Sequence, residues 1–125
     1  MEDRQRTVFN ALAERFGVGY TYAQFQRDFS GWTFDYIYKL DQCIGATISR
    51  NGFIHVAILE QYRKSWAKKN EISYLIRSAM KDGKAYTTLF KDDEFRKDFA
   101  KRLGFRLIED GAIQTYEVTY ENLWK

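Results

Sequence analysis

A two-residue alternation of apolar and polar side chains runs from Trp32 to Leu40. This period is typical of a β-strand that packs one face against a core. A second apolar run, Cys43–Ser49, follows directly, so Asp41-Gln42 is expected to form a tight turn between two strands. The pattern therefore predicts a hairpin in this part of the chain.

A third strand is predicted over Phe53–Leu59. It follows Asn51-Gly52, the strongest turn signal in the chain, because both residues tolerate a positive φ. The run is almost continuously apolar, which is typical of a strand buried on both faces at the centre of a sheet. We therefore expect Phe53–Leu59 to be the central strand.

Helical periodicity precedes these strands. Apolar residues at helical spacing predict a helix over Asp3–Phe16. Thr21 with Gln24 three residues later is the pattern of a capping box, which predicts a second, short helix ending near Phe29.

The C-terminal half alternates helices and strands. The expected elements are a helix over Ser65–Met80, a strand over Ala85–Phe90, a helix over Asp93–Leu103 with Phe95, Phe99 and Leu103 as its core stripe, and a hairpin of Phe105–Glu109 with Ile113–Tyr120 around Asp110-Gly111. Because a helical crossover precedes Ala85–Phe90, this strand should lie parallel to Phe53–Leu59. The order α-α-β-β-β-α-β-α-β-β predicts an α+β fold, with a mixed, mostly antiparallel sheet and a central parallel pair, in a single domain over residues 1–125.

Composition narrows the classes of function. Hydrophobic residues make up 45% of the 125 residues and aromatic residues 18%, which is enough for a packed core. The net charge of +3 is too small to indicate nucleic-acid binding by itself. One histidine and one cysteine argue against the usual metal clusters, so no metal is expected. Cys43 is expected to be a small buried apolar residue, in keeping with a cytoplasmic setting. No apolar run has the ~20 residues of a membrane span.

Three features carry a resemblance to a known family: Gly45 in the hairpin, the central strand followed by a basic loop and a helix, and the junction Leu103-Gly104-Phe105. From Trp32 to Val118 the chain resembles the GNAT acyltransferase superfamily. The resemblance implies that acyl-CoA would lie between the two central parallel strands. Its pyrophosphate would then sit on backbone amides at the start of the third helix, where N–H groups and the helix dipole favour an anion.

The family's phosphate loop has the pattern [R/Q]-x-x-G-x-[G/A], and the matching run here is Arg63–Lys68. Arg63 fits the first position, whereas Trp66 and Lys68 replace small residues. Glycine allows the closest approach of a phosphate because it has no Cβ, so we expect Trp66 to block or narrow this cradle. The alternative interpretation is a solvated basic helix start. The residues assigned to acetyl-CoA by the resemblance are Ile58, Leu59, Arg63, Lys64, Ser65, Trp66, Ala67, Lys68 and Asp93.

Two family positions are altered. Ala100 stands where many members have a tyrosine that acts as general acid, and Asp93 stands where many have an asparagine. Glu60, at the end of the central strand, is the candidate general base, although solvated acids are common at such positions. His55 should point to the opposite face by strand alternation, and we expect it to be a core histidine.

These observations leave three hypotheses for function. The first is a divergent GNAT-fold protein that acts through protein contacts. Its compact chain resembles small GNAT-like proteins of tailed bacteriophages, which implies a role in head assembly or as an internal virion component, in the host cytoplasm or the virion. The family opens with a strand, whereas this chain opens with a helix, so an edge of the sheet is expected to be free for a partner. The alternatives are an active acetyl-CoA-dependent N-acyltransferase and a nucleic-acid-binding module.

Overall fold

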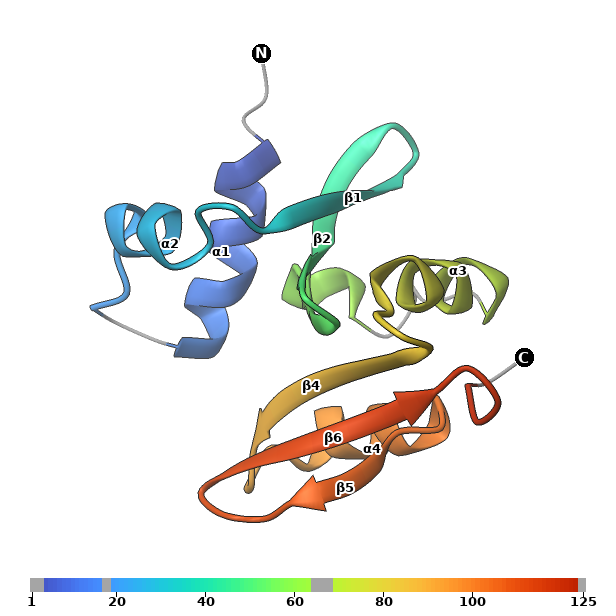
Figure 1. The fold of residues 1–125 in the computed structure, drawn as a ribbon. Helices are drawn as coiled ribbons and strands as arrows, with labels where there is room; N and C mark the ends of the chain where they lie inside the picture. Colours follow the sequence, from blue (N-terminus) through green and yellow to red (C-terminus); the bar gives the residue numbers. More distant parts are fainter. Residues whose placement is uncertain (1–3, 17–18, 64–68, 124–125) are drawn as a thin grey trace. The chain divides into compact units, whose positions relative to one another are not determined.

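The computed structural model describes residues 4–16, 19–63 and 69–123. Within these ranges the chain forms four α-helices, one short 3-10 helix and six strands. In chain order they are α1 (Arg4–Phe16), α2 (Tyr22–Asp28), β1 (Thr33–Lys39), β2 (Gln42–Arg50), β3 (Phe53–Ile58), the 3-10 helix η1 (Glu60–Tyr62), α3 (Lys69–Ala79), β4 (Lys84–Phe90), α4 (Glu94–Arg102), β5 (Arg106–Glu109) and β6 (Ile113–Thr119). The predicted α+β class and the predicted order of helices and strands are confirmed (Figure 1).

The six strands form one mixed sheet in the order β1-β2-β3-β4-β6-β5. β3 and β4 are parallel neighbours, with Phe53 opposite Tyr86, and β6 is antiparallel to both β4 and β5. The backbone N–H of Tyr86 donates to the Gly52 carbonyl at 2.8 Å, and the rings of Phe53 and Tyr86 lie 5.4 Å apart. The predicted central parallel pair is therefore confirmed.

The described residues group into two compact units. The first lies within Met1–Ile48 and Val56–Ala67, and the second within Ser49–His55 and Lys68–Lys125. The division falls inside β2 and β3, so each of these strands contributes to both units. The expectation of a single domain over residues 1–125 stays a prediction.

The core of the first unit joins α1 and α2 to β2 and β3. Its most deeply buried members include Val8, Leu12, Phe25 and Ile48, each at most 2% exposed. The predicted capping box opens α2: the Gln24 N–H donates to Thr21 Oγ1 at 3.2 Å, and the Thr21 N–H donates to Gln24 Oε1 at 3.0 Å. The aromatic rings of β1 extend this core. Phe34 lies 6.0 Å from Phe25 in an edge-to-face arrangement and stacks on Tyr36 at 5.9 Å.

The first hairpin turns one residue earlier than predicted. Leu40 and Asp41 form the turn, with φ of 51° and 67°, and Gln42 already belongs to β2. A two-residue turn with two positive φ angles matches the twist of the strands it joins, and this requirement outweighs the alternation that placed Leu40 in the strand. The Leu40 side chain is 95% exposed. Asn51-Gly52 forms the second turn, as predicted, with φ of 52° and 88°.

The sheet of the second unit has one face that is more deeply buried than the other. Ala85 of β4 and Val118 and Tyr116 of β6 are buried on one face, together with Ala100 and Leu103 from α4 and its end. The predicted core stripe of α4 is only partly confirmed, because Leu103 is buried whereas Phe95 is 49% exposed. Gly104 follows the helix with φ of 104°, and a Cβ there would meet the Asn122 carbonyl oxygen, so this junction needs glycine.

Candidate functional site

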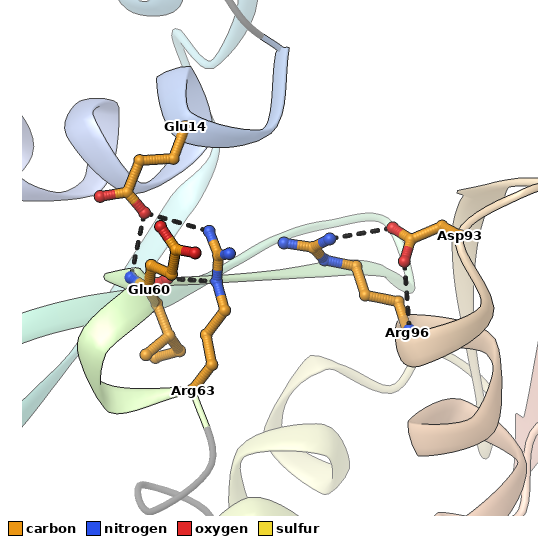
Figure 2. A network of polar contacts seen from close by, with 6 residues as sticks. Glu14, Glu60, Arg63, Asp93 and Arg96 are labelled. Carbon is orange, nitrogen blue, oxygen red and sulfur yellow. Dashed lines mark hydrogen bonds and ion pairs between the residues drawn. The ribbon is translucent and has the colours of Figure 1, made fainter.

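The strongest candidate site is the end of β3, where the chain turns into η1. Glu14 from α1 and Arg63 from the end of η1 meet there (Figure 2). Arg63 Nη2 lies 3.1 Å from Glu14 Oε2, and the backbone N–H of Glu60 donates to the same oxygen at 3.0 Å. One carboxylate oxygen therefore receives both a guanidinium and a backbone donor, and charge-assisted bonds of this kind are among the stronger polar contacts in proteins.

Backbone groups at this strand end are also satisfied within the chain. Arg63 Nε donates to the Ile58 carbonyl at 3.1 Å, so the guanidinium bridges the strand and α1 (Figure 2). The Leu59 N–H donates to the Ile44 carbonyl at 3.0 Å, and the Tyr62 N–H donates to the Leu59 carbonyl at 2.9 Å. A ligand that used the backbone of Ile58, Leu59 or Glu60 would have to displace contacts that already exist.

The close approach of β2 to β3 explains why glycine stands at position 45. A Cβ at Gly45 would meet the Ala57 carbonyl oxygen and would lie 2.9 Å from the Ile58 Cα. Real Cβ atoms essentially never come this close to backbone, so a larger residue would push β2 away from the end of β3. Gly45, one of the features that carry the resemblance, thus allows β2 to lie close to the end of β3, the region in which Glu14 contacts Arg63.

The Glu14–Arg63 pair is partly shielded from water. The side chain of Arg63 is 22% exposed and that of Glu14 is 35% exposed. An anion that approached Arg63 would compete with a carboxylate already in place, and it would also bring negative charge close to Glu14. Because like charges at short range repel, this arrangement disfavours a phosphate at Arg63 unless Glu14 moves away.

Glu60 lies in η1, beyond the last residue of β3. The alternation of side chains along a strand, which predicted opposite faces for His55 and Glu60, therefore does not extend to Glu60. Glu60 is exposed, and His55 is half-buried within β3. The backbone of Glu60 is held by Glu14, and this contact positions the residue without assigning any role to its carboxylate.

Asp93, the other described cofactor candidate, caps its own helix. Its Oδ1 accepts the Arg96 backbone N–H at 3.2 Å, and its Oδ2 lies 2.9 Å from Arg96 Nη1 (Figure 2). Both carboxylate oxygens thus serve the start of α4, as expected for an N-cap with a nearby cation. Ala100 is 5% exposed in the same helix, so the position that the resemblance assigns to a tyrosine acid carries a methyl group in the core.

Five of the residues assigned to the cofactor are Lys64, Ser65, Trp66, Ala67 and Lys68, and all five lie outside the residues that the structure describes. The expectation that Trp66 blocks a phosphate cradle therefore stays a prediction.

Glu14 is the member of this site that sequence reasoning missed. It lies on the predicted first helix, among other polar residues, and 49 positions before Arg63. An exposed glutamate on an amphipathic helix is ordinary, so a single sequence contains no local signal of this pairing.

Among the described residues, no group of three or more His, Cys, Asp or Glu side chains is placed to hold a metal ion. In that same part of the chain, every helix is too short or too polar to cross a membrane.

Comparison with known proteins assigns the chain to no family. No protein-family model matches the chain, and no curated protein sequence is significantly similar to it.

Proposed function

We propose that this protein is a divergent GNAT-like domain that acts through protein contacts and not by acyl transfer. The observation that carries the proposal is the contact of Glu14 with Arg63 and with the backbone N–H of Glu60 at the end of β3. Arg63, the residue expected to attract the CoA phosphates, is held at 3.1 Å by this carboxylate and also donates to the Ile58 carbonyl. Arg63 is used here to join α1 to the end of β3.

Two further positions support the proposal. Departure of a thiolate benefits from a positioned acid, typically by ~10²–10⁴-fold in rate, and the buried methyl group of Ala100 cannot supply a proton. Asp93 is committed to Arg96 and to the N-terminus of α4. Among the described residues, an acyltransferase on this chain would therefore lack a tyrosine acid at position 100, and Arg63 and Asp93 would be engaged with other side chains. Alignment of the reactants is itself a large part of catalysis.

Exposed apolar side chains support a role in protein contacts. In the second unit Leu107, Ile108 and Ile113 are 45%, 53% and 57% exposed. Large apolar side chains left exposed can serve as contacts for another protein. The narrower role in head assembly or inside the virion of a tailed bacteriophage is part of this proposal and follows from the resemblance alone.

Calorimetric titration with acetyl-CoA tests the proposal. We expect the wild-type protein to show no binding with a Kd below ~1 mM. Glu14→Gln removes the carboxylate charge that pairs with Arg63 and keeps a side-chain oxygen that can accept the Glu60 N–H. Any increase in acetyl-CoA affinity in this variant would show that the Glu14 charge keeps the cofactor away from Arg63. Arg63→Ala is its matched control, because it removes the cation that would attract the phosphates.

The opposite result would restore the enzyme hypothesis. Micromolar binding of acetyl-CoA by the wild type, together with CoA release to an amine acceptor that Glu60→Gln abolishes, would contradict the proposal and identify Glu60 as the general base. Trp66→Gly tests the separate expectation about the phosphate cradle. Binding to DNA or RNA with a steep salt dependence would instead favour the nucleic-acid hypothesis.

A further inference from the structure

The turn between β2 and β3 contains the one Asn-Gly sequence of the chain, Asn51-Gly52. Both residues have positive φ, 52° and 88°, and Asn51 is exposed. Within the part of the chain that the structure describes, neither the Asn51 side chain nor the Gly52 N–H makes a hydrogen bond. Because glycine has no Cβ, nothing on Gly52 itself shields its backbone nitrogen from the Asn51 side chain.

An asparagine followed by glycine can lose its side-chain amide without an enzyme. The Gly52 nitrogen attacks Cγ of Asn51, and the new C–N bond closes a succinimide ring. The side-chain nitrogen leaves as ammonia, taking the proton of the Gly52 N–H. Water then opens the ring: attack at Cγ gives aspartate, and attack at the backbone carbonyl carbon gives isoaspartate. In isoaspartate the main chain runs through the side-chain carbons, so it is longer by one carbon.

The other three asparagines lack this combination of features. Asn10 and Asn70 lie in α1 and α3 and are followed by residues that have side chains, which crowd the attacking nitrogen. Asn122 is followed by Leu123, whose N–H already donates to the Thr119 carbonyl at 3.0 Å. Ring closure is therefore easiest at Asn51.

Two Asp-Gly sequences, Asp82-Gly83 and Asp110-Gly111, form the same ring more slowly, because an ionised carboxylate resists attack by a nucleophile. At the second of them, Asp110 Oδ1 accepts both Gln114 Nε2 and the Gly111 N–H at 2.8 Å. These hydrogen bonds, that of Gln114 first, lower the pKa of Asp110 and keep its carboxylate ionised.

We propose that Asn51 is the site of spontaneous deamidation in this protein, and that isoaspartate at this position loosens the pairing of β3 with β4. The Gly52 carbonyl accepts the Tyr86 N–H at 2.8 Å, beside the pair formed by Phe53 and Tyr86. An additional backbone carbon in a two-residue turn moves this carbonyl while the strands keep their register. The inference goes beyond the proposed function and does not depend on it.

Packing around Gly52 makes the reaction slow and its effect lasting. Gly52 is buried, and a Cβ placed on it would lie 3.4 Å from Lys81 Cβ and 3.7 Å from Tyr86 Cδ2. The turn must therefore open before the ring closes, so deamidation should be slower in the folded protein than in urea. The longer isoaspartate backbone does not fit the closed turn, so the turn stays disturbed once the product has formed.

Peptide mapping of the aged protein tests the site. The full chain is held for several weeks at mildly alkaline pH, where base removes the Gly52 amide proton, and is then cleaved after lysine. Residues 40–64 form one peptide whose only asparagine is Asn51. Isoaspartate has the same mass as aspartate and is distinguished by an isoaspartate-specific methyltransferase. We expect the product to accumulate at Asn51, while Asn10, Asn70 and Asn122 stay at their unaged level.

Two variants separate the effect of the backbone from that of the charge. Asn51→Gly suits a positive φ and cannot deamidate, so its denaturation midpoint should not change with ageing. Asn51→Asp carries the new charge on a normal backbone. The isoaspartate fraction should unfold at lower urea concentration than Asn51→Asp, and its Tyr86 amide should exchange hydrogen faster. The Tyr120 amide, which donates to the Gly83 carbonyl at 2.9 Å in another turn, is the control for exchange.

Equal accumulation at all four asparagines would overturn the proposed site. So would a folded protein that forms no isoaspartate at Asn51 while the same chain in urea does, because the closed turn would then protect the residue. An isoaspartate fraction that matches Asn51→Asp in both its denaturation midpoint and its Tyr86 exchange would overturn the proposed effect on β3 and β4. Titration with acetyl-CoA bears on none of these results.

Discussion

Glu14 and Arg63, 49 positions apart in the chain, form an ion pair of 3.1 Å that closes the end of β3. The same Glu14 oxygen accepts the backbone N–H of Glu60. A single helical glutamate therefore joins α1 to the segment that follows the central strand. Because of this contact, the guanidinium of Arg63 and the backbone N–H of Glu60 are both bonded to Glu14.

A double-mutant cycle measures this ion pair. We expect Glu14→Ala and Arg63→Ala to show a coupling free energy of about 1 kcal/mol, at the upper end for exposed pairs, because both side chains are partly shielded. The coupling should fall at ~1 M salt, since screening weakens charge interactions. Urea denaturation of the four proteins gives the value. A coupling that is zero within error at low salt would show that the pair does not stabilise this part of the fold.

Replacing Thr47 by valine is expected to stabilise the protein. Thr47 is 1% exposed, and its hydroxyl has no hydrogen-bond partner among the residues that the structure describes. Thr47→Val removes this buried polar group and keeps the branched shape, so the free energy of unfolding should rise by about 1 kcal/mol. Thr47→Ser is the control, because it keeps the hydroxyl and loses a methyl group. A lower denaturation midpoint for Thr47→Val would mean that the hydroxyl is satisfied after all.

Leu40 is expected to be unfavourable in its turn. Its φ of 51° is a conformation that leucine rarely adopts, and its side chain is 95% exposed, so packing offers little compensation. Leu40→Asn should raise the free energy of unfolding by about 0.5–1 kcal/mol, because asparagine tolerates this conformation. Asn51→Leu provides the reciprocal control, since Asn51 has a φ of 52° in the equivalent turn position of the next hairpin and should lose stability. Equal midpoints for Leu40→Asn and wild type would contradict the argument.

Stability should fall at alkaline pH through Tyr20. Burial, with a smaller contribution from Asp28, raises the pKa of Tyr20 from 10.0 to about 12. The folded state keeps the phenol proton over the range in which the unfolded chain loses it. The stabilisation is therefore complete below about pH 10 and is lost as the pH rises towards about 12.

Comparison with Tyr20→Phe isolates this effect, because phenylalanine does not titrate. The difference in denaturation midpoint between wild type and variant should be constant below about pH 10 and should then shift against the wild type. In a phenolate absorbance titration the variant should lack one of the latest-titrating tyrosines. A difference in midpoint that does not change up to about pH 12 would show that the pKa of Tyr20 is not raised.

The sequence alone determined the elements whose signals are local. The capping box of Thr21 and Gln24 and the turn at Asn51-Gly52 depend on neighbouring residues, so they were predicted at the positions where the structure has them. The parallel pairing of β3 with β4 also followed, because a helical crossover leaves few alternatives for the next strand.

Tertiary structure alone decided the features that depend on distant parts of the chain. The contact between Glu14 and Arg63 requires α1 to meet the end of β3, and nothing in either local sequence marks it. The exposure of Phe95 and of the β5 residues likewise depends on which neighbours the packed chain brings to them. Periodicity identifies which residues share a face, but only the packed fold determines which part of that face is covered, because burial depends on neighbours that are remote in sequence.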